Sequence, residues 1–276
     1  MNSICFPDGT RVPVLGQGTW NMAEKAARRA EEIAALREGV ALGLTLIDTA
    51  EMYADGESER LVGEALRGLR EQVFLVSKAY PQHASRDRLA PACEASLRRL
   101  GTDRLDLYLL HWRGRVPLSE TVEAMENLVA AGKIRRWGVS NLDAADMREL
   151  RAAGGMACAT NQILYNLTRR GPEYDLLPWL ADEGIPVMAY SPVEQGRLLD
   201  NRVLREVAAR LGATPAQVAL AWVLRQPQVM AIPKAGRVEH VRENRRAADL
   251  PLTASDLAEL DAGFPPPQEP TPLEML

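Results

Sequence analysis

The sequence predicts a (β/α)8 barrel (a TIM barrel) with an N-terminal β-hairpin and extra helices outside the barrel. Short apolar runs alternate along the chain with segments of helical periodicity, which indicates a parallel sheet covered by helices. Polar residues suited to chemistry follow these runs, as they do at the single mouth of a barrel. A Rossmann fold would need GxGxxG after its first strand, and the candidate segment at residues 16–21 lacks the third glycine.

Length and charge narrow the class of protein. The chain has 276 residues, 46% hydrophobic and 25% charged, with a formal net charge of −4. Barrels of this type form one domain of about 250 residues. We therefore expect a single domain over residues 1–276, including a hairpin in residues 1–14 and a Pro-rich, loosely held tail in residues 265–276. The negative charge argues against nucleic-acid and membrane-surface partners.

Cysteine usage and the N-terminal segment indicate a cytoplasmic protein. Cys5, Cys93 and Cys158 form no CxxC pair, so we interpret them as free thiols of a reducing compartment. The N-terminus lacks the pattern of a signal peptide. No apolar run approaches the roughly 18 residues that span a bilayer.

The elements follow in chain order. Residues 4–7 and 11–14 flank Asp8-Gly9, a dipeptide suited to a two-residue type I′ turn of a hairpin. Helices are predicted where apolar residues share one face, around residues 33–40, 118–129 and 203–211, and Thr214-Pro215 is typical of a helix start. Buried strands are predicted at residues 45–47, 73–76, 105–110, 137–139, 185–190 and 229–232.

A series of polar residues falls at or just past the ends of the predicted strands, at intervals of 22 to 44 residues. Because the carboxyl ends of all barrel strands meet at one mouth, we expect these side chains to surround one site. The last interval leaves room for an extra helix around residues 201–211. The series consists of Asp48, Lys78, His111, Ser140, Asn141, Gln162, Tyr190, Ser191 and Lys234.

Four residues on neighbouring strands suit the reduction of a carbonyl group, which needs an acid for the developing alkoxide. Tyr53 could donate that proton, but tyrosine has an ordinary pKa near 10 and is a weak acid. A buried lysine such as Lys78 would lower that pKa, and the carboxylate of Asp48 would keep the ammonium charged. His111 could donate a hydrogen bond to the carbonyl oxygen and orient it.

With these residues in place, the chain resembles the aldo-keto reductase superfamily over almost its whole length. Each motif alone would be weak, but six in order at barrel spacing are specific. Within the superfamily the pattern is most similar to bacterial reductases of methylglyoxal and other 2-oxoaldehydes. The motifs are residues 43–53 (GLTLIDTAEMY) continued by 59–63, then 77–78, 109–112, 132–141, 189–192 and 231–234.

The resemblance implies roles for these residues. Tyr53 would be the proton donor, Asp48 and Lys78 would tune its pKa, and His111 would orient the substrate. It also implies NADP(H) bound in an extended form. Ser140, Asn141, Gln162 and Tyr190 would contact the nicotinamide, Ser191, Gln195 and Gly196 the pyrophosphate, Lys234 the 2′-phosphate, and His240, Glu243 and Asn244 the adenosine end. The remaining expected cofactor contacts are Gly18, Thr19, Trp20, Asp48, Pro192, Ile232, Ala235 and Gly236, and the expected substrate pocket consists of Trp20, Tyr80 and Trp112.

One position departs from the pattern of the superfamily. Many members have an arginine six residues after the phosphate-binding lysine, and here that position is His240, with Arg237 and Arg242 nearby. Arginine is always charged and binds phosphate bidentately, whereas histidine is partly neutral at pH 7. We therefore expect NADP(H), held mainly by Lys234, with weaker discrimination against NAD(H).

Other interpretations of the same residues stay open. Singly, Asp48 could structure a turn, and His111 could be a core histidine. Lys78 could form a Schiff base, as in barrel aldolases, although this would leave Tyr53 unexplained. The same fold could also serve as a non-catalytic NADP(H)-binding sensor or regulatory subunit. Three histidines without a ligand-like spacing give no reason to expect a metal site.

Overall fold

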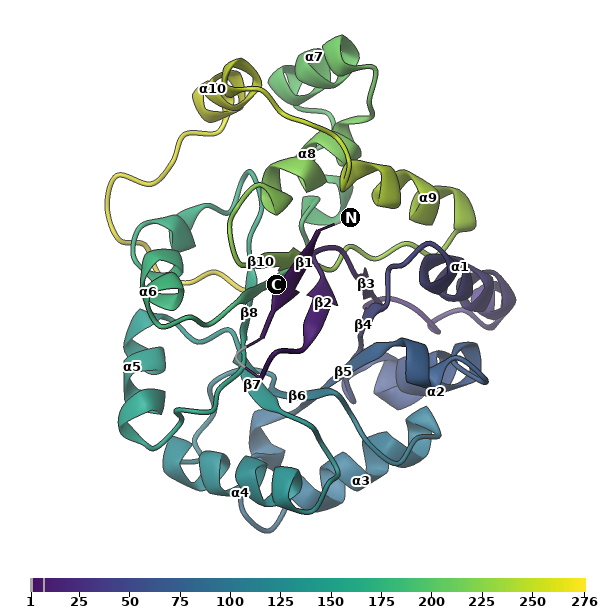
Figure 1. Ribbon diagram of the computed structural model, residues 1–276, viewed down its shortest axis with the longest axis vertical. Helices are drawn as coiled ribbons and strands as arrows, with labels where there is room; N and C mark the ends of the chain where they lie inside the picture. Colours follow the sequence, from purple (N-terminus) through teal and green to yellow (C-terminus); the bar gives the residue numbers. More distant parts are fainter. Residues whose placement is uncertain (1, 7) are drawn as a thin grey trace.

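The computed structural model describes residues 2–6 and 8–276, and it confirms the predicted (β/α)8 barrel. Eight parallel strands follow one another around the sheet in chain order, and helices surround them (Figure 1). The strands are β3 (Gln17–Gly18), β4 (Leu46–Asp48), β5 (Phe74–Ala79), β6 (Leu107–Leu110), β7 (Trp137–Ser140), β8 (Asn161–Leu164), β9 (Val187–Tyr190) and β10 (Val229–Ala231).

The barrel closes where the first strand, β3, meets the last, β10. The Gly16 amide donates to the Ala231 carbonyl at 2.8 Å, and the Gly18 amide donates to the Pro233 carbonyl at 3.1 Å. A Cβ atom on Gly18 would lie 2.6 Å from the Ile232 carbonyl oxygen, so only glycine permits this close approach. The first strand of the site is thereby fixed against the last.

Helices follow the strands as predicted, and two of them, α7 and α10, lie outside the ring (Figure 1). The extra helix expected around residues 201–211 is α7, and Thr214 caps the next helix in a capping box with Gln217. The helices are α1 (Arg29–Ala41), α2 (Glu57–Ala65), α3 (Leu89–Leu100), α4 (Leu118–Ala130), α5 (Ala144–Ala152), α6 (Leu176–Asp182), α7 (Arg202–Leu211), α8 (Pro215–Leu224), α9 (Val238–Ala247) and α10 (Ala254–Gly263). Short 3-10 turns are η1 (Ala26–Arg28), η2 (Tyr53–Gly56), η3 (Arg70–Gln72), η4 (Pro81–His83), η5 (Gly171–Glu173) and η6 (Glu194–Gly196).

The predicted hairpin is present, but its predicted two-residue turn is wrong. Strands β1 (Ser3–Cys5) and β2 (Arg11–Pro13) pair antiparallel, and the Phe6 amide continues the pairing by donating to the Thr10 carbonyl. The connection therefore holds three residues, with Gly9 at a φ of +85°. Three-residue loops commonly end in such a left-handed residue. Pro7, which the predicted first arm included, lies outside the described residues.

Apolar side chains fill the barrel and the layer between strands and helices. The hairpin lies across the centre of the barrel in Figure 1, and its Ile4, Phe6 and Val12 pack with barrel residues such as Leu46 and Met230. The hairpin thus closes one end of the barrel with apolar side chains. Polar residues gather at the other end, where the strands finish.

The tail is more tightly placed than its composition indicates. Leu273 packs against the main core, Glu274 pairs with Arg169, and Met275 and Leu276 line the cavity described below. These contacts hold residues 273–276 in place, whereas the expected surface position agrees with the exposure of Met275 (55%) and Leu276 (49%). Proline-rich composition excludes a helix or strand, but it does not prevent a segment from packing in an extended form.

Across residues 2–6 and 8–276, no single helix is long and apolar enough to cross a membrane. The pair α7 and α8 passes that test only jointly, and the two helices are bent by 92° relative to each other.

Candidate active site

The loops that follow the barrel strands carry an unusual share of strained backbone. Non-glycine residues with positive φ include Asn21 after β3, Ala54 after β4, Asn141 after β7, and Ser191 and Gln195 after β9. Such conformations cost about 1–3 kcal/mol each and tend to cluster at functional sites. Their gathering at one end of the barrel marks this end as the candidate site.

Three of the four predicted catalytic residues share direct hydrogen bonds. Lys78 on β5 is fully buried, and its Nζ donates to Asp48 Oδ2 at 2.7 Å and to Tyr53 Oη at 3.0 Å. The Thr49 carbonyl accepts the third bond from the same ammonium, at 2.9 Å. An ammonium has three donors, so the buried charge is completely satisfied.

The surroundings of Lys78 and Tyr53 keep both side chains protonated. Burial lowers the pKa of Lys78, but Asp48 and Tyr53 raise it more, so the net pKa lies above the ordinary value and the ammonium stays charged. Burial raises the pKa of Tyr53 by more than Lys78 lowers it. The expected lowering of the Tyr53 pKa was therefore wrong as a net direction, because the effect of burial exceeds that of the ammonium. Tyr53 remains a protonated phenol at neutral pH.

His111 follows β6 and faces Tyr53 edge-on, with ring centroids 5.8 Å apart. Burial, helped by the nearby charge of Lys78, lowers the pKa of His111 to about 2. The imidazole is therefore neutral. Its Nδ1 is buried without a hydrogen-bond partner among the residues that the structure describes. A neutral imidazole at this place can offer one N–H to an oxygen in the cavity.

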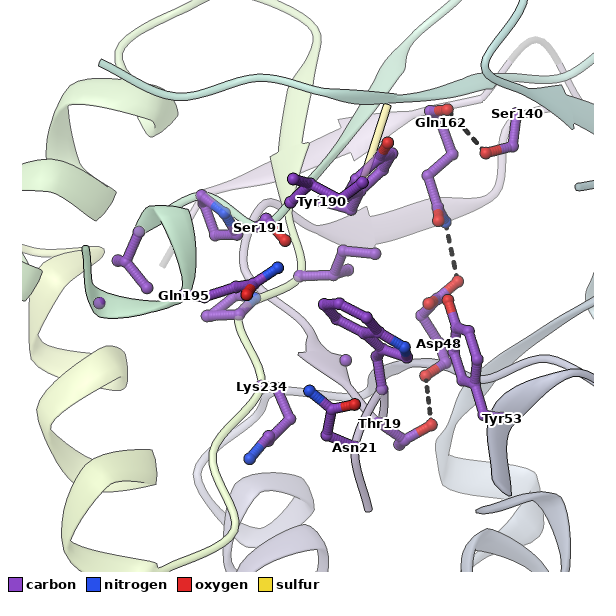
Figure 2. A pocket seen from close by; sticks show the side chains of 18 of the residues that line it. Thr19, Asn21, Asp48, Tyr53, Ser140, Gln162, Tyr190, Ser191, Gln195 and Lys234 are labelled. Carbon is purple, nitrogen blue, oxygen red and sulfur yellow. Dashed lines mark hydrogen bonds between the residues drawn. The ribbon is translucent and has the colours of Figure 1, made fainter. Parts of the chain in front are cut away.

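A cavity of about 790 Å³ opens at the mouth of the barrel beside these residues. Along one wall, hydrogen bonds connect Ser140 through Gln162 to Asp48 (Figure 2). Ser140 Oγ donates to the Gln162 carbonyl at 2.8 Å, and Gln162 Nε2 donates to Asp48 Oδ1 at 2.8 Å. Tyr190 Oη donates to Asn141 Oδ1 at 3.0 Å. The structure thus places these five predicted residues together at the cavity.

The segment after β9 forms another wall. Ser191, Pro192, Gln195 and Gly196 all line the cavity, as predicted from their positions. Asn166 holds the segment from behind, because its Nδ2 donates to the Ser191 carbonyl at 2.9 Å. In Figure 2 Gln195 and Lys234 lie on the side of the cavity away from Tyr53 and Gln162. The cavity is therefore long enough to separate a catalytic end from a cationic end.

The cationic end lies between β10 and α9. Lys234 is exposed to the cavity and forms no ion pair with any described residue. His240, Glu243 and Asn244 line the same end. The two nearby arginines instead pair with carboxylates on α1: Arg237 Nε lies 3.5 Å from Glu31 Oε1, and Arg242 Nε lies 2.7 Å from Glu38 Oε1.

Not every predicted site residue reaches the cavity. Trp20 and Trp112 line it, but Tyr80 stands behind Trp112, with ring centroids 5.9 Å apart at 89°. Lys78 does not line the cavity and contacts two residues that do, Tyr53 and Asp48. Ala235 and Gly236 do not line the cavity either. The remaining expected contacts, Gly18, Thr19 and Ile232, do line it.

Several lining residues were not predicted. Met275 and Leu276 belong to the tail, whose return to the mouth had no sequence signal beyond its two final apolar residues. Asn21 directly follows a predicted residue, Trp20, and could have been found by its position. The others are Met52, Val193, Leu199, Ala216 and Pro233. Within the part of the chain that the structure describes, no group of His, Cys, Asp or Glu is arranged to hold a metal ion.

Comparisons with known proteins agree with this geometry. The sequence profile of the aldo/keto reductase family matches residues 14–263. The chain is 57% identical to the methylglyoxal reductase YeaE of Escherichia coli (strain K12) over 279 residues, which cover 99% of this chain and 98% of that protein. It is 32% identical to a glyoxal reductase of Bacillus subtilis (strain 168) over 261 residues, covering 95% and 92% of the two chains.

A solved structure extends the likeness to three dimensions. The aldo/keto reductase from Klebsiella pneumoniae in complex with NADP and acetate superposes with a TM-score of 0.97 at 56% identity, covering 99% of each chain. The profile and these relatives each span nearly the whole barrel. The chain therefore belongs to the aldo/keto reductase family.

Proposed function

We propose that this aldo/keto reductase uses NADPH to reduce small uncharged aldehydes and ketones to alcohols, with methylglyoxal-like 2-oxoaldehydes and aromatic aldehydes as substrates. The observation that carries the proposal is the contact of Lys78 with both Asp48 and Tyr53, beside His111, at one end of a long cavity. The relatives support it, because two of them are a methylglyoxal reductase and a glyoxal reductase and a third was crystallised with NADP. These relatives favour an enzyme over a cofactor-binding sensor.

The residues that line the cavity suit a dinucleotide along its length. The amides of Asn141 and Gln162 at the catalytic end match a carboxamide, and Lys234 at the far end is a free cation for a phosphate. The backbone of Ser191 and Gln195, between the two ends, would face the pyrophosphate. When bound, the cofactor supplies a hydride to the carbonyl carbon.

The residues of the chain supply the proton and the orientation. Tyr53 stays protonated because it is buried, and it would transfer its hydroxyl proton to the oxygen of the carbonyl as negative charge develops there. Lys78, 3.0 Å away and charged, would stabilise the phenolate that remains. The neutral His111 would donate a hydrogen bond to the same oxygen. General acid catalysis of this kind contributes a factor of about 10²–10⁴.

The surroundings of the catalytic end favour uncharged substrates. Trp20, Met52 and Trp112 line it, and Lys234 is the only lysine or arginine among the described residues that line the cavity. Lys234 lies at the other end (Figure 2). A substrate carboxylate beside these apolar side chains would lose its hydration without gaining a cationic partner, at a cost of several kcal/mol.

The same reasoning extends to cofactor choice and to partners. Since Arg237 and Arg242 are paired with α1, Lys234 and His240 would recognise the 2′-phosphate, and NADH would be accepted more readily than by a site with arginine. We further propose a cytoplasmic protein without nucleic-acid or membrane partners, because the net charge is −4 and the cysteines are free thiols. We also propose a monomer, because members of this family are often monomers.

A substrate panel tests the proposal. NADPH oxidation would be followed with methylglyoxal, an aromatic aldehyde and glyoxylate, the carboxylate analogue of comparable size. We expect kcat/KM for methylglyoxal to exceed that for glyoxylate by at least about 100-fold, since an unpaired buried charge costs more than about 3 kcal/mol. Equal rates with glyoxylate would refute the proposed substrate class. Cofactor binding without turnover on the whole panel would support the sensor alternative.

A further inference from the structure

One arginine outside the cavity contacts two segments that line it. Arg169 lies in the loop after β8. Its Nη2 lies 2.9 Å from Glu194 Oε1, in the segment after β9. Its Nη1 pairs with Glu274 in the tail. The guanidinium is about one-third exposed and donates to both carboxylates at once.

The partner in the first segment is a buried carboxylate. The Glu194 side chain is only 5% exposed, and it also accepts from Arg197 at 2.7 Å and from Asn166 at 2.8 Å. Burial would raise the pKa of Glu194, but these three donors lower it below its ordinary value. Glu194 itself has a φ of +47° and stands between Ser191 and Gln195, whose φ angles are also positive. The ion pair therefore holds a strained segment whose residues line the cavity.

The partner in the tail precedes two apolar residues at the mouth. Met275 and Leu276 line the cavity, yet they are 55% and 49% exposed. Leu273, on the other side of Glu274, packs against the core. The contact between Glu274 and Arg169 thus holds the tail directly before the two residues that line the cavity, and Tyr190 contacts the backbone of the last of them, Leu276.

We propose that Arg169 is a positioning residue that couples the cofactor segment, residues 191–196, to the tail, residues 273–276. This inference rests on the proposed function, in which the cofactor contacts Ser191 and Gln195. A cofactor bound there limits the motion of Glu194, and Glu194 in turn limits the motion of the Arg169 guanidinium. The guanidinium then holds Glu274 more tightly. The tail then covers the substrate, and by thermodynamic linkage an ordered tail strengthens cofactor binding by the same factor.

Hydrogen–deuterium exchange in the tail is the direct test. In the wild-type protein, saturating NADP+ should slow amide exchange in residues 273–276 by about fivefold, at the lower end of ordinary coupling between sites. Glu274→Gln should abolish the slowing while the protein still binds NADP+ in a fluorescence titration. The matched control is Glu269→Gln, which removes the same charge from an exposed position a few residues before the tail and should behave as the wild type does.

The outcomes are distinguishable. Slowing that persists in Glu274→Gln, or a wild-type tail that does not respond to bound NADP+, would overturn the coupling and leave the proposed function intact. A wild-type protein that does not bind NADP+ would overturn both.

Kinetics give a second readout, independent of the first. Arg169→Ala should raise KM for the carbonyl substrate about fivefold with little change in kcat, because the tail covers the substrate and does not take part in proton transfer. Arg169→Lys keeps a cation and should recover part of the loss. An unchanged KM in Arg169→Ala would contradict the inference, as would equal effects of the alanine and lysine variants.

Discussion

At the scale of single residues, the site depends on a buried ammonium with three acceptors. Lys78 is fully buried, and its bonds to Asp48, Thr49 and Tyr53 use all three donors. The sequence predicted two of these partners, Asp48 and Tyr53, because both follow the same predicted strand. The Thr49 carbonyl was not predictable, because it belongs to the backbone of a loop, and the residue type does not determine where a loop carbonyl points.

Removing the ammonium should cost both stability and activity. Lys78→Met leaves the Asp48 carboxylate buried without its charge partner, which typically destabilises a protein by about 3–5 kcal/mol. Chemical denaturation measures this loss. The double variant Asp48→Asn with Lys78→Met removes both charges and should recover much of the stability, but not the activity. Equal stability of the single and double variants would show that the two charges are not energetically coupled.

His111 gives the protein a pH dependence of known sign. Burial and the charge of Lys78 lower the pKa of folded His111 to about 2, whereas an unfolded histidine titrates near 6.5. The unfolded chain therefore binds the proton first as the pH falls. The stabilisation is complete above about pH 6.5 and declines below it by about 1.4 kcal/mol per pH unit.

Comparing denaturation of the wild type and His111→Gln between pH 7.5 and pH 5 isolates this effect. The variant should lose less stability on acidification than the wild type does. Parallel pH profiles for the two proteins would mean that His111 is solvated or charged in the folded state.

At the scale of elements, the apolar strands were predictable and the polar ones were not. Strands β4, β5, β6, β7, β9 and β10 correspond to predicted apolar runs. Strand β3 has only two residues, and β8 begins Asn161-Gln162, so neither has an apolar signal. Both strands pair with their neighbours in the sheet. The polar side chains of β8 are also hydrogen-bonded, since Asn161 donates to the Leu142 carbonyl and Gln162 to Asp48. The length of the hairpin turn and the contacts of the tail were not predicted for a similar reason, because pairing and packing with other segments determine them.

Helix α9 carries the residue that we expect to set the cofactor preference, His240. His240 lines the cavity at the cationic end, where relatives with arginine would have a permanent charge. His240→Arg should raise the ratio of kcat/KM with NADPH to that with NADH about tenfold, the value of one additional charge-assisted hydrogen bond. The matched control is Arg237→Gln, which should change the ratio little because Arg237 pairs with Glu31. A large effect of Arg237→Gln with none of His240→Arg would assign the phosphate contact to Arg237.

At the scale of the whole molecule, the alternation of strand and helix correctly predicted a parallel sheet covered by helices, the polar residues at the strand ends correctly favoured the barrel, and the sequence motifs correctly predicted the family. It also predicted the end at which the polar residues meet, because all carboxyl ends of the strands share one mouth. The length of the cavity and the cover that the tail provides are properties of tertiary packing, which periodicity does not report. We propose that residues 1–276 form one domain, since the hairpin and the tail both pack on the same barrel.

The most direct test of the account is the effect of Tyr53→Phe on turnover and on cofactor binding. The variant removes one hydroxyl group and keeps the ring. We predict that kcat with methylglyoxal and NADPH falls by a factor of at least about 10². The NADPH dissociation constant from fluorescence titration should stay within about twofold of the wild-type value. Such a change is well under the tenfold change that about 1.4 kcal/mol of binding free energy would bring. Turnover close to wild type, or a loss of NADPH binding that accounts for the lost turnover, would contradict the assignment of Tyr53 as the proton donor.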